Sequence, residues 1–164
     1  MDQFILKHVL GKLLLVLIMV SLLVGSIIYL NSRWAKIRDI RRQADAQSIT
    51  KALNFYQAQF GNYPDSLDDD GDGWDKSNDE HRIFLEPLAK VGLLPSLVFD
   101  PQNDEEHYYR YQKFEPGDFG CQKPYAVFQV ASFETKDKNS GSGSCPDIDW
   151  VHYAPLGFTW FGED

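Results

Sequence analysis

The sequence predicts an α+β fold in which one long N-terminal helix packs on a small antiparallel β-sheet. Three observations predict it. Residues 13–30 are eighteen consecutive uncharged residues, most of them Leu, Val or Ile. A helical period with one apolar side continues from there to Phe60. The C-terminal part carries short segments rich in Tyr, Phe and Val, which favour strands.

The apolar run is long enough to span a membrane. At 1.5 Å per residue, residues 13–30 make about 27 Å of helix, and Lys12 can extend the span by reaching toward the headgroups. We therefore expect a transmembrane helix over 13–30 and a cytoplasmic N-terminus over 1–12. A cleaved secretory signal is the alternative, but the run exceeds the usual apolar core of roughly 7–15 residues and no A-x-A-like site follows it.

Residues 31–60 predict an amphipathic continuation of the same helix. Apolar residues recur at steps of three and four, which marks one face for burial. They are Ile37, Ile40, Ala44, Ile49, Leu53, Tyr56 and Phe60. Gly61 and Asn62 then end the helix, with Pro64 beyond as a stop signal. We expect one helix from about Val9 to Phe60, followed by a globular head over residues 61–164.

The head is predicted to hold a short helix and an antiparallel sheet. The helix is expected over 83–91, ended by Gly92 and Pro95. The expected strands are 107–114 and 125–133, with weaker candidates at 150–153 and 158–161. Residues 136–144 (KDKNSGSGS) are predicted to be a flexible hairpin tip.

Charge is divided unevenly along the chain. Residues 1–42 carry seven Lys or Arg against two Asp, a net charge of +5. Because the whole chain has a net charge of −8, residues 43–164 carry −13. A strongly acidic head argues against nucleic acid as a partner. The basic cluster beyond the apolar run either contacts anionic lipid headgroups or forms a solvated helix face. Its members are Arg33, Lys36, Arg38, Arg41 and Arg42.

The two cysteines, Cys121 and Cys145, flank the Gly/Ser-rich segment and predict one disulfide. Closing a loop of about 25 residues would contribute on the order of 3 kcal/mol, which matters to a head with a modest core. The bond also requires an oxidising compartment. Two unrelated buried thiols or a metal pair are the alternatives, but no CxxC motif and no neighbouring His pair support a metal.

Residues 68–75 (DDDGDGWD) contain D-x-D-x-D-G, the opening of a calcium-binding loop. Alternate carboxylates can converge on one hard cation, and the glycine permits the sharp turn. The expected ligands are Asp68, Asp70, Asp72, the Trp74 carbonyl and, at the twelfth place, Asp79. We therefore expect calcium as a cofactor. An acidic solvated loop is the alternative, although its carboxylates would repel one another without a cation.

The residues give no support to an enzyme. The four histidines are scattered and neither H-E-x-x-H nor G-x-S-x-G occurs. We expect no catalytic residues. A set of aromatic side chains either forms a stacking surface for sugars or partners or fills the contact of a sheet with a helix, and we expect the second. The set is Tyr108, Tyr109, Tyr111, Trp150, Trp160 and Phe161.

Residues 38–66 (RDIRRQADAQSITKALNFYQAQFGNYPDS) resemble the segment just after the membrane helix in pseudopilins of type II secretion systems and related type IV pilin-like proteins. The matching positions are Arg38, Asp39, Arg42, Ile49, Ala52, Leu53, Tyr56, Gly61, Tyr63 and Pro64. A looser match continues through Leu88, Gly92, Leu94, Pro95, Asp100-Pro101 and Tyr109-x-Tyr111. The resemblance implies a membrane-anchored structural subunit whose partners are the lipid bilayer, other pilin-like subunits and an inner-membrane assembly platform.

The expected topology follows from two opposing signals. Basic residues are more numerous after the span than before it, which by the positive-inside rule favours a cytoplasmic head. The cysteines, the acidic head and the resemblance favour the opposite. We expect a cytoplasmic N-terminus and an extracytoplasmic head, periplasmic or at the cell surface.

The sequence departs from the family at the leader. The family's peptidase site is a Gly followed by Phe or Met and then Thr-Leu-Ile-Glu, whereas this chain has Gly11, Lys12 and three leucines, then Val16 in place of the assembly Glu. Residues 1–12 therefore resemble a degenerate leader, with Gly11 and Lys12 at the cleavage position. Two functions remain: an assembly subunit, or a non-polymerising anchored binding module with a pilin-like head.

Overall fold

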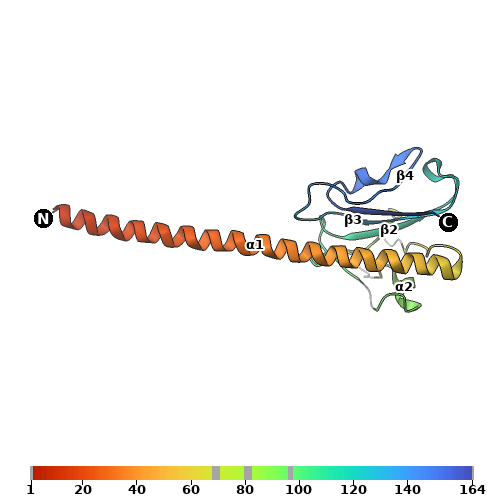
Figure 1. Cartoon of the computed structure of the whole chain (residues 1–164), viewed down its shortest axis with the longest axis horizontal. Coiled ribbons are helices and arrows are strands. Elements are labelled where there is room, and N and C mark those ends of the chain that lie inside the picture. Colours follow the sequence, from red (N-terminus) through yellow and green to blue (C-terminus); the bar gives the residue numbers. More distant parts are fainter. Residues whose placement is uncertain (1, 68–70, 80–82, 96–97, 164) are drawn as a thin grey trace. The chain divides into compact units, whose positions relative to one another are not determined.

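The computed structural model describes residues 2–67, 71–79, 83–95 and 98–163 (Figure 1). The chain divides into two compact units, residues 1–37 and 38–164. One helix, α1 (Asp2–Phe60), extends through both. The fold is α+β, with one long N-terminal apolar helix and a small antiparallel sheet, as predicted.

The first unit consists of the N-terminal part of α1. From Leu10 the helix is long and apolar enough, by length and composition, to cross a membrane. Its most apolar window has a mean hydropathy of 2.8 and none of that window is buried. The hydroxyls of Ser21 and Ser26 donate back to the carbonyls of Ile18 and Leu22 at 2.9 and 2.8 Å, so these polar groups are satisfied within the helix.

The C-terminal end of α1 lies at Phe60, as predicted. Gly61 adopts a left-handed conformation (φ 80°) and its N–H donates to the carbonyl of Gln57 at 2.8 Å. Glycine takes this conformation without steric cost, which explains why the helix stops here.

The second unit is built on a four-stranded antiparallel sheet of order β1-β2-β3-β6. The strands are β1 (Asp75–Lys76), β2 (Tyr109–Phe114), β3 (Tyr125–Val130) and β6 (Phe158–Glu163). A separate hairpin joins β4 (Ser144–Cys145) to β5 (Ile148–Asp149). Three short helices complete the unit: α2 (Glu86–Lys90), η1 (Asp118–Gly120) and η2 (Trp150–Tyr153).

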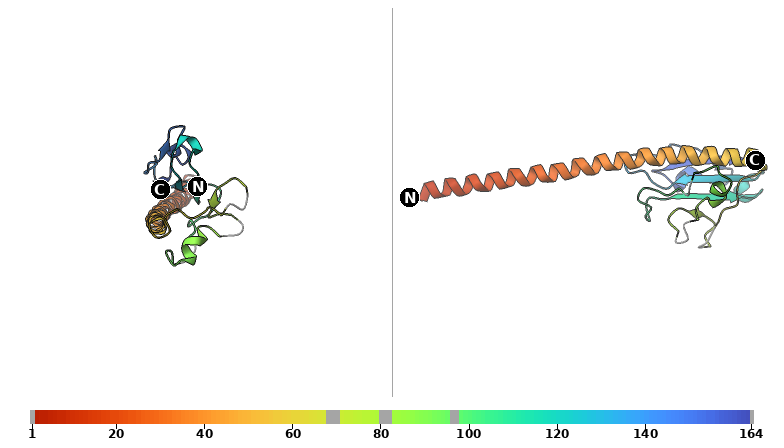
Figure 2. Two further views of the ribbon diagram at one scale, coloured as in Figure 1. Left: turned by 90° about the vertical axis from the view of Figure 1, so that its right-hand side faces the viewer. Right: turned by 90° about the horizontal axis from the view of Figure 1, so that it is seen from below.

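The sheet is covered on both sides. On one side, here called the helix face, Tyr109, Tyr111, Ala126, Phe128 and Val130 pack in one core with Ala46, Ile49 and Leu53 of α1. On the other side, here called the outer face, Phe114, Tyr125 and Val127 pack with Trp150 and the two cysteines. Figure 1 shows α1 and β4 on opposite sides of the sheet, and the two views of Figure 2 agree. Because side chains of a strand alternate between faces, all six residues of β3 are buried.

The predicted apolar stripe on α1 is wrong in its first half. Ile37, Ile40 and Ala44 are exposed, Ile40 by 66%. The side of the helix turned to the head instead carries Asp39 and Arg42, both buried, ahead of the apolar residues that follow. Phe60 at the other end is also 47% exposed. The physical reason is a buried ionic network around Arg42, described below.

Several boundaries in the head also differ. Residues 150–153 form the 3₁₀-helix η2 and not a strand, because Asp149 caps the turn by accepting from the backbone N–H of Val151 at 3.0 Å. The short helix α2 is confined to Glu86–Lys90. Strands β2 and β3 are shorter than predicted, whereas the weak candidate at 158–161 is confirmed as β6.

Residues 136–144 are not a hairpin tip. The N–H groups of Ser140 and Ser142 donate to the carbonyls of Gly157 and Thr159, both at 3.2 Å, so this segment lies along the edge of β6. A Cβ on Gly141 would overlap the Thr159 carbonyl, and this close approach explains the glycine there. The hairpin turn lies further on, at residues 146–147.

Candidate functional site

The predicted calcium loop lies partly outside the described residues. Asp68 and Asp70 are among the residues that the structure does not describe. Asp72 accepts from the backbone N–H of Trp74 at 2.9 Å, and its other oxygen lies 2.5 Å from the amine of Lys76. Asp79 accepts from the backbone N–H of Lys76 at 3.1 Å. The described loop therefore pairs its carboxylates with nearby cations and amides.

Over residues 2–67, 71–79, 83–95 and 98–163, no group of three or more His, Cys, Asp or Glu side chains is placed to hold a metal ion. The indole of Trp74 packs edge-on against Phe114 and Trp150, with ring centroids 6.1 and 5.8 Å apart. Calcium binding by this loop stays a prediction.

The predicted disulfide is confirmed. Cys121 and Cys145 are bonded, with their Cα atoms 5.2 Å apart. Both are buried in the core of the outer face. The bond ties the loop after η1 to strand β4, so it closes the set of short segments that cover that face.

The predicted leader position lies in helix. Gly11 and Lys12 are exposed residues within α1, with no atom within 4 Å of where a Cβ on Gly11 would lie. Whether a peptidase cleaves there stays a prediction.

Arg42 is the most elaborately bonded side chain of the second unit. It is fully buried and its guanidinium forms two parallel bonds to Asp100, at 2.6 and 2.9 Å. It also donates to Asp39 at 2.9 Å, to Glu134 at 2.7 Å and to the side-chain oxygen of Gln102 at 2.8 Å. All five N–H donors of the guanidinium are therefore satisfied. The bidentate pair fixes the Asp100 loop against α1.

The neighbours of Arg42 complete an ionic cluster of Arg38, Asp39, Arg42, Asp100 and Glu134, here called the Arg42 cluster. Asp39 accepts from the backbone N–H groups of Glu134 and Thr135, at 3.0 and 2.8 Å, and Arg38 donates to Glu134 through two nitrogens. Hydrogen bonds from Arg38 and then Arg42 lower the pKa of Glu134 to about 2. Arg38 and Arg42 thus bind carboxylates of the head. The interpretation that they contact lipid headgroups is wrong for these two residues.

The sequence carried a signal for this cluster. Asp39 and Arg42 are three residues apart, and Arg42, Ala46, Ile49 and Leu53 continue at steps of four, three and four on the same helix face. A search for apolar residues alone does not identify this face as buried, because its first two residues, Asp39 and Arg42, are charged. Its distant partners, 58 and 92 residues away, had no local signal.

The opposite side of α1 is exposed and carries two large apolar residues among polar ones such as Gln47 and Lys51. Ile40 and Phe55 are 66% and 65% exposed, and Ala44 lies between them on the same side. Within residues 38–60 this side faces away from the sheet core.

The outer face holds a cavity of about 400 Å³. Its aromatic lining is Trp74, Phe114, Phe119, Trp150 and Tyr153, and its polar lining is Asp72, Arg110, Gln112 and Asp118. The residues come from the loop before β1, from β2, from η1 and from the continuous segment β5–η2, which also contributes Ile148, so four separate segments meet there. We call this cavity the outer-face pocket.

Gln129 explains why these segments meet. It is fully buried on β3, accepts from Arg110 at 2.8 Å, and donates to the Trp150 carbonyl at 2.6 Å and to the Thr159 hydroxyl at 3.0 Å. One polar residue in a buried strand therefore positions both Arg110 and η2. The guanidinium of Arg110 lies 4.4 Å from the ring centroid of Trp74 and donates to the Tyr153 carbonyl at 3.0 Å.

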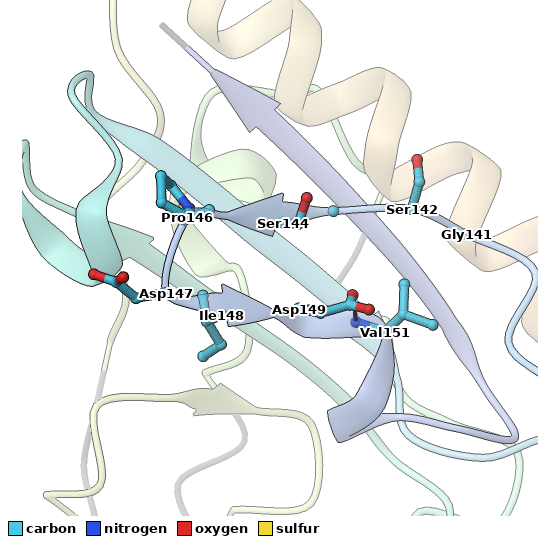
Figure 3. A pocket seen from close by; sticks show the side chains of 10 residues that line it. Gly141, Ser142, Ser144, Pro146, Asp147, Ile148, Asp149 and Val151 are labelled. Carbon is cyan, nitrogen blue, oxygen red and sulfur yellow. Dashed lines mark hydrogen bonds between the residues drawn. The ribbon is translucent and has the colours of Figure 1, made fainter.

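A second, more open hollow of about 560 Å³ lies over the β4–β5 hairpin. Figure 3 shows its small side chains, with Ser144 and Asp149 opposite each other on the two strands. Asp149 already caps η2 and contacts His152 at 3.1 Å. This hollow lacks aromatic side chains.

The sequence pointed to aromatic residues as a stacking surface or a helix contact. The structure divides them: Tyr109 and Tyr111 contact the helix core, whereas Trp150 lines the outer-face pocket. Phe119 and Tyr153 of the pocket were missed, because their loops carry no periodic pattern. No protein-family model, curated protein or solved structure matches this chain significantly.

Proposed function

We propose that this chain is a membrane-anchored structural subunit of a type II secretion or type IV pilus-like assembly. One observation carries the proposal: the helix α1 is exposed and apolar over residues 13–30, and its C-terminal part packs on a four-stranded sheet. Such a helix can hold a subunit in lipid and later bury the same surface against sister chains. In this proposal the N-terminus is cytoplasmic and the head extracytoplasmic.

Two features support the proposal. The disulfide requires an oxidising compartment, which fits a head outside the cytoplasm. The exposed side of α1 carries the large apolar residues Ile40 and Phe55, which neighbouring copies would cover. The loop over residues 68–79 would bind calcium and stiffen the head.

Cysteine crosslinking in membranes tests this function. Both cysteines of the chain are bonded to each other, so one added cysteine supplies the free thiol. Ile40→Cys on the exposed side of α1 should form oligomers on oxidation, whereas Glu115→Cys, equally exposed in the head, should form far fewer. Equal crosslinking of the two variants would refute assembly through α1.

A second function, a non-polymerising anchored module that binds an extracellular ligand, is favoured by Val16 in place of the family's assembly Glu. Mass spectrometry of the membrane-extracted protein separates the two. Removal of a peptide ending at Gly11 supports the assembly subunit, and an intact N-terminus favours the binding module.

A further inference from the structure

The outer-face pocket combines exposed aromatic rings with polar side chains. Tyr153 and Phe119 are 59% and 43% exposed, although both rings contact the buried ring of Trp150, at centroid distances of 5.7 and 5.2 Å. Large aromatic side chains normally bury most of their area. Here a packed indole supports two rings whose other surfaces face solvent.

The polar lining of the pocket has unused bonding capacity. One oxygen of Asp118 accepts from the backbone N–H of Glu115 at 3.0 Å, and its other oxygen has no hydrogen bond to the described residues. The side-chain amide of Gln112 has none in that part of the chain either. Both therefore offer planar acceptors and donors beside the aromatic rings.

Charge and geometry exclude several ligand classes. Lys76 pairs with Asp72 at 2.5 Å, and the charges of Arg110 and Asp118 cancel, so the pocket has no excess positive charge to attract an anionic polymer, and the head around it carries −13 over residues 43–164. Arg110 already lies over the ring of Trp74 at 4.4 Å, so that ring is not open to a further cation. A purely apolar ligand would cover the four polar side chains without offering them hydrogen bonds, which is unfavourable.

We propose that the outer-face pocket binds a neutral carbohydrate. A pyranose ring has one face of C–H groups, which would stack on Tyr153 or Phe119, and a rim of hydroxyls, which would bond to Asp118 and Gln112. A pocket of about 400 Å³ accommodates one or two sugar rings. This inference does not depend on whether the chain assembles into a filament.

The test uses the full-length chain in a polyoxyethylene detergent, because glycoside detergents would compete. The probes are neutral tetrasaccharides of β-1,4-glucose, α-1,4-glucose, β-1,4-N-acetylglucosamine and α-1,6-mannose, titrated with tryptophan fluorescence and calorimetry as readouts. At least one should bind with a dissociation constant in the millimolar range or tighter. Absence of binding to all four would overturn the proposal.

Variants locate the site. Tyr153→Ala should weaken binding about tenfold, Tyr153→Phe should retain it, and Asp118→Asn should weaken it by a smaller factor. Phe55→Ala removes an equally exposed ring from α1 and should leave binding unchanged. Near-UV circular dichroism establishes that each variant is folded. Unchanged binding in both Tyr153→Ala and Phe119→Ala, or preferential salt-dependent binding of a sulfated oligosaccharide or a lysine-rich peptide, would refute the proposal.

Discussion

The two faces of the sheet are closed by different means. One continuous helix covers the helix face through Ala46, Ile49 and Leu53, and the Arg42 cluster locks it at one end. Short segments, η1, η2 and the β4–β5 hairpin, cover the outer face, and a disulfide joins two of them. Beside α1 the helix face leaves a pocket of about 160 Å³, whereas the outer face leaves a cavity of about 400 Å³.

The difference shows how a small domain divides its tasks. A long helix brings many side chains to the sheet at the entropic cost of ordering one regular element. Short irregular segments bring few, so they need a covalent link and Gln129 to hold them. They also leave exposed rings, which makes the outer face the better candidate for ligand binding.

The largest effect should come from breaking the Arg42 cluster. Arg42→Met leaves the buried Asp100 without its bidentate partner, which should lower the free energy of unfolding by about 3–5 kcal/mol. Urea unfolding of the detergent-solubilised chain, followed by near-UV circular dichroism, measures it. Arg41→Met is the control, because that side chain is 63% exposed and lies 3.7 Å from Asp45. Equal losses in both variants would contradict the role of the cluster.

Removing the disulfide should destabilise the outer face by somewhat less. Replacing Cys121 and Cys145 by Ser opens a loop with a sequence separation of 24, which should cost about 3 kcal/mol. Removing the disulfide should increase the rate of amide hydrogen exchange more at β4, β5 and η2 than at the contact between β2 and α1. A uniform increase over both faces would show that they unfold as one unit.

A smaller loss is expected where the Gly/Ser segment lies along β6. Gly141→Ala places a methyl group against the Thr159 carbonyl, which should cost about 1–3 kcal/mol. Ser142→Ala, one residue on and exposed, should change stability by less than about 0.5 kcal/mol. Thermal unfolding measures the melting temperatures of the two variants. Similar values would mean that the segment moves away from β6 and accommodates the methyl group without loss of stability.

The smallest effect should be the acid response of Glu134. Hydrogen bonds from Arg38 and Arg42 lower its pKa from 4.5 to about 2, so its contribution is complete above pH 4.5 and is lost as pH falls toward 2. Exposure of the carboxylate reduces the size of the contribution. The free energies of unfolding of Glu134→Gln and of the unsubstituted chain should differ most above pH 4.5, and the difference should shrink as the pH falls toward 2. A difference independent of pH would exclude titration of Glu134 as its source.

Local signals predicted the regular elements well. The helix ends at Phe60 because Gly61 follows, and the aromatic runs at Tyr109 and Tyr125 are strands. The disulfide followed from having two cysteines in one polar region. In each case the determining residues lie close together in the sequence or are few enough to leave little choice.

What could not be predicted depends on distant partners. The two-residue strand β1 exists only through its pairing with Tyr111 and Arg110, and the buried side of α1 is set by acids far along the chain. The outer-face pocket forms only when four separate segments come together. Hydrophobic periodicity cannot detect a buried arginine, since it scores that position as solvent-facing.

The backbone bonds from Ser140 and Ser142 to residues 157 and 159 have a consequence for association. They occupy carbonyls that an incoming strand of another molecule would otherwise use, along the first half of β6. Two copies of this chain are therefore hindered from pairing sheet to sheet along this part of β6. Any contact made along this part of β6 would then depend on side chains, which can be selective where backbone pairing is not.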